Sequence, residues 1–245
     1  MLTLPEKGNI IYKTKRDILL IVSDMELVFV NETLASRIKY FENIPATPRK
    51  DRILSRLGYR EGVTELKPGD SLLIENCIQQ GRFLCKPAGA YLNLSILERD
   101  TTGVVLENKL SLLSKSLANL LKDSQSVILM ASTVGHEVSK RIFNEIENGN
   151  ASAGLILDSV ASQTADAALD WMVQMLGKLL AREGKKLTKH RYSPGFGDLP
   201  LFYQKDIFEA LQLSKLDMAL TEKFMLIPEK SVIAITGVEE KGETK

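Results

Sequence analysis

The amino-acid sequence predicts an α+β fold in which a mainly antiparallel sheet is flanked by helices. Short strand-like runs lie in the middle of the chain and near its C-terminus. One long helical pattern separates these two groups of runs. The runs do not alternate regularly with helices, as the strands of a parallel sheet with crossover helices would.

The first 46 residues are predicted to form a strand-like N-terminal extension, followed by one domain over 47–245. The extension contains three aliphatic or β-branched runs separated by polar breaks, at 10–12, 18–22 and 27–30. Two prolines, Pro45 and Pro48, then interrupt the pattern. Thr47 is expected to cap a helix over 49–57 that ends at Gly58.

The middle of the chain, 68–150, is predicted to alternate between helix and strand. Asp70 is a candidate N-cap of a helix whose buried stripe includes Cys77, and Gly81 marks a weak point in that helix. Ser114 is expected to cap a short helix that reaches Leu121. Strands are expected at 90–97, 104–106 and 126–131.

An Ala- and Leu-rich stripe predicts the longest helix over 151–182. A basic turn over 182–191 follows it. A helix over about 203–211 and two strand-like segments, near Met218 and over 231–238, complete the pattern.

Composition excludes several functional classes. The 245 residues are 44% hydrophobic and 26% charged, with a formal net charge of +1. This near-neutral balance argues against a nucleic-acid partner bound by excess positive charge. The apolar run Ile18–Val22 is far shorter than the roughly 20 residues of a membrane span. Neither a membrane span nor export is therefore expected, and the expected location is cytoplasmic.

No catalytic or metal-binding signature is present in the sequence. Phosphate-loop, dinucleotide-binding and zinc-protease motifs are absent, and His136 and His190 lack spaced metal-ligand neighbours. We therefore expect no catalytic residue and no metal site. Cys77 and Cys85 are expected to pack as small hydrophobic side chains. Acid–base chemistry by some of the 31 carboxylates stays open.

The stretch 191–198, Arg-Tyr-Ser-Pro-Gly-Phe-Gly-Asp, combines groups that suit a small ligand with a carboxylate and a flat ring. The Arg191 guanidinium can form paired hydrogen bonds with a carboxylate. Gly195 allows close backbone approach, and the Phe196 ring can pack on a heterocycle. An ordinary Pro-Gly turn explains the same residues equally well.

Two blocks resemble the activation domain of cobalamin-dependent methionine synthase. Arg191-x-x-Pro194-Gly195-Phe196 is similar to its Arg-x-x-x-Gly-Tyr motif. The segment 220–232, with Leu-Thr-Glu-x-Phe, then Pro, then Ser-Val, is similar to its Leu-Thr-Glu-x-Phe…Pro-x-x-Ser-Val block. The long helix with Asp166 stands where that family has an acidic helix. The resemblance spans about 48–238.

The resemblance implies a curved sheet and the function of a stand-alone homologue of that domain. The family binds S-adenosylmethionine and presents it to a partner's cobalamin, which is reduced, usually by flavodoxin, and remethylated. In this sequence Arg191 would bind the carboxylate of the ligand, Gly195 would offer backbone contacts, and Phe196 would occupy the family's tyrosine position. Pro194 and Asp166 complete the expected cofactor-binding set.

The implied partners are a cobalamin-binding methionine synthase or another corrinoid protein, with flavodoxin or another electron donor. The chain lacks the Asp-x-His-x-x-Gly cobalamin motif, so cobalamin would come only on the partner. It also lacks the family's Asp-Trp-Thr-Pro segment and the tyrosine hydroxyl at Phe196. The alternatives are a corrinoid-docking or scaffolding module without S-adenosylmethionine, and a free-standing enzyme with an unrelated substrate. Whether the chain is itself an enzyme stays open.

Overall fold

The computed structural model describes residues 10–13, 19–23, 26–30, 34–60, 62–65 and 67–242. The chain divides into two compact units, 1–38 and 39–245. In the first unit, three strands form an antiparallel sheet in the order β1-β2-β3. Its elements are β1 (Ile10–Lys13), β2 (Leu19–Ser23), β3 (Glu26–Val30) and the short helix α1 (Leu34–Arg37). The three strands lie within two residues of the positions predicted from the sequence.

The second unit is built on an antiparallel sheet of seven strands in the described part of the chain. Its order is β7-β6-β5-β8-β12-β9, and β4 also pairs with β5. The strands are β4 (Lys39–Phe41), β5 (Ala88–Arg99), β6 (Gly103–Leu106), β7 (Ser111–Leu113), β8 (Ser124–Thr133), β9 (Lys185–Leu187) and β12 (Ser231–Glu240). A small separate hairpin joins β10 (Ala219–Leu220) to β11 (Leu226–Ile227). Strand β4 lies in the segment that sequence analysis assigned to the N-terminal extension.

The centre of the sheet is the strand β8, which pairs with both β5 and β12. Ile128 and Met130 pack against the long helix α6 (Ala151–Ala181) on one face. Val127 and Leu129 alternate with them and are also fully buried, so both faces of the strand are covered. Register shifts interrupt the pairing of β5 with β6 and of β12 with β8, and such bulges bend a sheet. The predicted α+β class with a mainly antiparallel curved sheet is confirmed.

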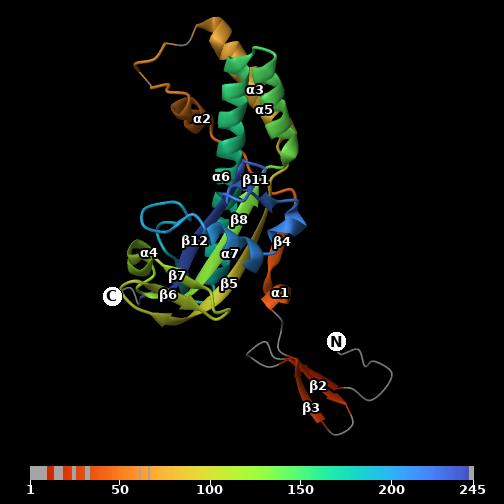
Figure 1. The fold of residues 1–245 in the computed structure, drawn as a ribbon, viewed down its shortest axis with the longest axis vertical. Coiled ribbons are helices and arrows are strands. Elements are labelled where there is room, and N and C mark those ends of the chain that lie inside the picture. The colour runs from red at the N-terminus through yellow and green to blue at the C-terminus, as the bar shows by residue number, and fades with distance from the viewer. Residues whose placement is uncertain are drawn as a thin grey trace. The chain divides into compact units, whose positions relative to one another are not determined.

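Helices α3 (Pro68–Leu84) and α5 (His136–Glu147) and the first half of α6 project from one end of this sheet (Figure 1). Helix α6 forms because small and aliphatic residues recur at helical spacing along 31 residues without a proline. Its first half packs with α3 and α5, and its second half packs on the sheet. The helices of this unit are α2 (Lys50–Arg56), α3 (Pro68–Leu84), α4 (Lys115–Leu120), α5 (His136–Glu147), α6 (Ala151–Ala181) and α7 (Tyr203–Ala210), with a 3-10 turn η1 at Leu213–Leu216.

Several local predictions are wrong. The residue before α3 is Lys67 and Pro68 is its first residue, so Asp70 lies in the first turn and is not the cap. Helix α2 begins after Arg49, so Thr47 does not cap it either. Gly81 does not interrupt α3 but brings it close to α6, because a Cβ at Gly81 would lie 2.6 Å from Val160 Cγ1. Helix α5 was not predicted.

Both thiols are in the apolar core formed by the helices, as expected. Cys77 and Cys85 are 4% and 5% exposed. Burial raises the pKa of the Cys85 thiol to about 11. Each sulfur therefore stays protonated and packs as a small hydrophobic group.

None of the helices in the described part of the chain has the length and hydropathy of a membrane span.

Candidate ligand-binding site

One face of α6 carries polar side chains where the helix passes from the other helices to the sheet. Asp166 and Asp170 are four residues apart and therefore share this face. Trp171 is beside them, and its ring makes an edge-on contact with Phe41 of β4, with 5.4 Å between the ring centroids. This contact fixes the indole where β4 and α6 meet.

The short helix α2 lies beside this face of α6. Its Ile53 is fully buried in the helical core, and the Ile53 carbonyl accepts a 3.2 Å hydrogen bond from the Ser159 hydroxyl of α6. Ile53 points into the core, whereas Arg52 and Arg56 lie together on an exposed face of α2. Arg49 just before the helix is already paired with Asp51, at 2.6 Å.

Helices α2 and α6, the segment that precedes α2, and the segment that carries Arg191 line a cavity of about 780 Å³. This volume lies within the roughly 300–1,000 Å³ range of small-molecule sites. Charged and amide side chains dominate its wall, together with one indole. The wall is formed by Pro45, Ala46, Thr47, Arg49, Arg52, Ser55, Arg56, Gln163, Asp166, Ala167, Asp170, Trp171, Gln174 and Arg191.

Arg191 enters the cavity from the segment that follows β9. The adjacent Tyr192 pairs with Ile235 of β12 through two backbone hydrogen bonds, of 2.9 and 2.7 Å. This pairing fixes the backbone beside Arg191. Its Nη1 atom lies 2.7 Å from Oδ1 of Asp170, and the Arg191 side chain is only 27% exposed. The structure therefore places a guanidinium and a carboxylate together at the wall.

Asp166 is the half-buried carboxyl group of this site. Burial raises the pKa of Asp166, because water no longer solvates the carboxylate fully. Arg191 opposes this rise, and the negative charge of Asp170 adds to it. The wall thus has both a hydrogen-bonding cation and carboxylates that can accept from an ammonium group.

The other predicted site residues belong to the loop after Arg191 and do not line this cavity. Pro194 is buried. Gly195 has φ of 91°, in the region that favours glycine, and its N–H donates to the Leu199 carbonyl at 2.8 Å. Phe196 is 70% exposed at the tip of the turn. The structure therefore brings Arg191 and Asp166 to one cavity and places Pro194, Gly195 and Phe196 beside it in the chain but outside its wall.

Asp198 connects this loop to the start of α4 by hydrogen bonds. Its carboxylate accepts from the Ser114 hydroxyl at 2.6 Å and from the Lys115 backbone N–H at 2.7 Å. These hydrogen bonds hold the pKa of Asp198 well below its usual range. The loop that follows Arg191 is thereby attached to the start of α4.

The second block of the resemblance forms a tight turn. Thr221 accepts hydrogen bonds from the backbone N–H groups of Phe224 and Met225, at 3.0 Å each, through its carbonyl and its hydroxyl. The turn joins β10 to β11, and the chain then enters β12 at Ser231. No residue of this block lines the cavity. The described contacts of this block form the turn between β10 and β11, which leads into β12.

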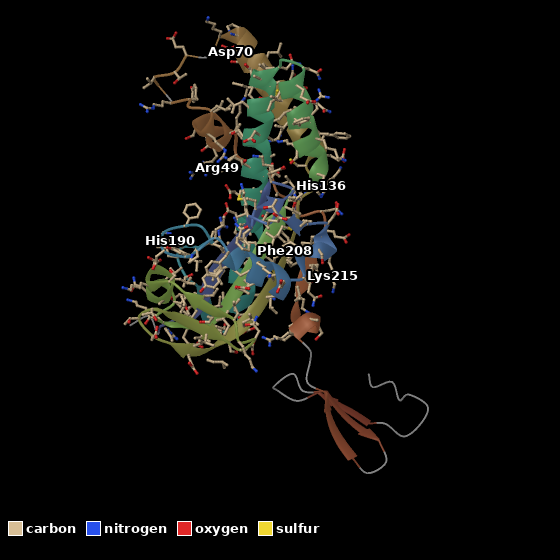
Figure 2. The ribbon with its side chains drawn as sticks, in the orientation of Figure 1. Arg49, Asp70, His136, His190, Phe208 and Lys215 are labelled. Carbon is tan, nitrogen blue, oxygen red and sulfur yellow. The ribbon has the colours of Figure 1, made fainter. Side chains whose placement is uncertain are left out.

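Sequence analysis missed Arg52 and Arg56 as cavity residues. Their four-residue spacing places both side chains on one side of the helix, which the sequence alone could indicate. The His136 and His190 side chains lie outside the cavity wall, and Figure 2 labels both. Among the described residues, no cluster of three His, Cys, Asp or Glu side chains could hold a metal ion.

The antiparallel sheet and the helices packed on it form an α+β fold. The chain is similar to the crystal structure of the MetH reactivation domain bound to AdoHcy, with a TM-score of 0.62. The match covers 85% of this chain and 80% of that chain, at 12% sequence identity. The resemblance predicted from the two sequence blocks is thus confirmed at the level of the fold. No family model matches the sequence, and no curated protein is significantly similar to it.

Proposed function

We propose that the chain is a stand-alone reactivation module for a cobalamin-dependent methionine synthase or another corrinoid methyltransferase. In this role it binds S-adenosylmethionine in the cavity between α2 and α6 and presents it for remethylation of the partner's cobalamin. The observation that carries the proposal is the position of Arg191 beside Asp166 and Asp170 in a cavity of about 780 Å³. The fold is that of a domain solved with AdoHcy.

Each charged end of the amino-acid part of the ligand has a matching group in the cavity. Arg191 would bind the ligand carboxylate. The ligand would replace Asp170 as the charged partner of the guanidinium group. Asp166 would accept hydrogen bonds from the ligand ammonium group. The Trp171 indole offers a flat surface for the adenine ring. The backbone of Gly195, the ring of Phe196 and Pro194 would contact the part of the ligand that extends beyond the wall.

Cobalamin and the electron would come from other proteins. The partner would be the cobalamin-binding part of a methionine synthase or another corrinoid protein. Flavodoxin or another electron donor would supply the reducing equivalent, and the expected compartment is the cytoplasm. The role belongs to methionine biosynthesis if the partner is methionine synthase.

Calorimetric titration with S-adenosylmethionine and S-adenosylhomocysteine tests the ligand. We expect one site per chain for each compound. 5′-Methylthioadenosine, which has no amino-acid carboxylate, is expected to bind at least tenfold more weakly, since it leaves Arg191 unused. No heat with any of the three at millimolar concentration would contradict the ligand assignment.

A second experiment tests the partner. A methionine synthase lacking its own reactivation domain, with its cobalamin in the inactive cob(II) state, is mixed with the chain, S-adenosylmethionine and reduced flavodoxin. We expect the methylcobalamin absorption spectrum to return only in the presence of the chain. A spectrum that returns equally without the chain would contradict the reactivation role.

A corrinoid-docking module that does not bind S-adenosylmethionine is the second candidate. Two observations favour it: Asp170 already occupies one nitrogen of Arg191, and Phe196 lies exposed outside the cavity wall. Binding of the corrinoid partner in the absence of any heat with S-adenosylmethionine would select this candidate over the first.

A further inference from the structure

The cavity has more positive charge than a single amino-acid ligand requires. Its wall contains four guanidinium groups and two carboxylates. Arg49 is paired with Asp51, and Arg191 with Asp170. Within the described part of the chain, the guanidinium groups of Arg52 and Arg56 have neither an ion pair nor a hydrogen bond.

These two arginines are held side by side by α2. Residues four apart on a helix have Cβ atoms roughly 6 Å apart, so both guanidinium groups can reach one ligand group. The helix itself is fixed by the buried Ile53 side chain between them and by its hydrogen bond to Ser159. Arg56 also lies close enough to Asp166 to influence its pKa. The pair is therefore part of the same cavity as the carboxylates of α6.

We propose that Arg52 and Arg56 form an anion subsite that binds the diphosphate group of a nucleotide. Guanidinium groups match phosphate oxygens with paired hydrogen bonds, and two of them match the charge of a diphosphate better than that of one carboxylate. The Trp171 indole and the amides of Gln163 and Gln174 line the same cavity. An aromatic face and amide groups suit a base, which distinguishes a nucleotide from a free inorganic anion.

This inference uses the cavity of the proposed function but does not require that S-adenosylmethionine binds there. A nucleotide at Arg52 and Arg56 would fill the space that an adenosyl group would use, so the two ligands are expected to exclude each other. Binding at this subsite should weaken as salt is added, because its main contacts are between charged groups at an open wall.

Calorimetric titrations with ADP, adenosine and inorganic pyrophosphate at low salt test the subsite. We expect ADP to bind most tightly and adenosine and pyrophosphate at least tenfold more weakly each. The double variant Arg52→Gln/Arg56→Gln should lose at least tenfold in affinity for ADP and for pyrophosphate, with adenosine unchanged. The matched control is Arg60→Gln, an exposed arginine outside the cavity wall, and it should bind all three as the wild type does.

A charge-preserving double variant, Arg52→Lys/Arg56→Lys, keeps the proposal testable if the glutamine variant folds poorly. It should retain the fold and lose part of the affinity for ADP, since an ammonium group does not reproduce the planar guanidinium. Wild-type ADP affinity in a folded double variant would overturn the subsite. Equal affinities of ADP and pyrophosphate would overturn the nucleotide assignment.

The same proteins separate this inference from the proposed function. No heat with ADP or pyrophosphate at millimolar concentration overturns the subsite, whatever S-adenosylmethionine does. ADP binding that requires Arg52 and Arg56, in a protein that gives no heat with S-adenosylmethionine, supports the subsite and contradicts the ligand of the proposed function.

Discussion

The carboxylate of Asp198 accepts a 2.6 Å hydrogen bond from the hydroxyl of Ser114, 84 residues earlier in the chain. The Ser114 hydroxyl in turn accepts from the Leu117 backbone N–H and caps α4, as the sequence predicted. One pair of side chains thus joins the loop after Arg191 to the helix that follows β7. The position of the loop depends on this connection.

Asp198→Asn is expected to lower the melting temperature at neutral pH. The folded-state pKa of Asp198 is depressed by its hydrogen bonds, so its stabilisation is present above the ordinary value of 3.8 and is lost as the pH falls below it. The difference in melting temperature between wild type and variant should therefore shrink between about pH 4 and pH 2. Thermal denaturation by circular dichroism across this range measures it. Asp123→Asn, which removes an exposed carboxylate just after α4, is the matched control substitution and should leave the melting temperature at neutral pH near that of the wild type.

Arg191→Ala and Arg191→Lys are expected to fold normally and to bind S-adenosylmethionine weakly. The pair with Asp170 is partly exposed, and such pairs contribute about 0–1 kcal/mol to stability. A charge-assisted contact to the ligand carboxylate is worth roughly 1.5–3 kcal/mol, which is about 10- to 150-fold in affinity for the alanine variant. Calorimetry and melting curves measure both quantities. Wild-type affinity in either variant would show that Arg191 does not contact the ligand.

Asp170→Asn is expected to strengthen binding of a carboxylate ligand. Asp170 occupies Nη1 of Arg191 in the free protein, and the ligand must replace that contact. Removing the competing negative charge should raise affinity by up to about fivefold, the value of an exposed ion pair. The measurement is a titration with S-adenosylhomocysteine at two salt concentrations. A clear loss of affinity would instead show that Asp170 holds the ligand ammonium group.

Two glycine substitutions in helices should change stability in opposite directions. At Gly81, an added Cβ would lie 2.6 Å from Val160 Cγ1, so Gly81→Ala should destabilise the protein by about 1–3 kcal/mol through overpacking. At Gly177 of α6, an added Cβ meets nothing within 4 Å, so Gly177→Ala should stabilise it by about 0.5–1 kcal/mol. Urea denaturation measures both. The cost of Gly81→Ala should be smaller when it is measured in the Val160→Ala background, where the crowded methyl groups are absent. An equal cost in both backgrounds would contradict this packing explanation.

The sequence predicts those parts of the fold whose residues follow a regular local pattern. The apolar stripe of α6 and the continuous apolar run of β8 identify both elements to within two residues. Helix α5 was missed although Val138, Ile142 and Ile146 recur at four-residue spacing, so an amphipathic helical pattern was present in the sequence. Gly81 was misinterpreted because its reason lies in a contact with Val160, which sequence spacing does not reveal.

The candidate site was predicted in part. Arg191 was named from the chemistry of its stretch and from the resemblance, Asp166 was named from the resemblance alone, and both line the cavity. Sequence analysis predicted the helix that contains Arg52 and Arg56 but gave these two residues no role. Their placement depends on the tertiary contact between Ile53 and Ser159, 106 residues apart. A motif shows which residues recur together, but the wall of a cavity depends on how distant elements pack.

The continuous helix α6 gives the molecule a mechanical connection. Its 31 residues extend about 46 Å without a proline, so a single backbone element spans both packing regions of this unit. Asp170 lies in the half of α6 that packs on the sheet, and Arg191 is attached to β12 of the same sheet through Tyr192. The ion pair therefore joins two segments that one sheet already holds, and the same helix continues from this pair to the cluster that it forms with α3 and α5.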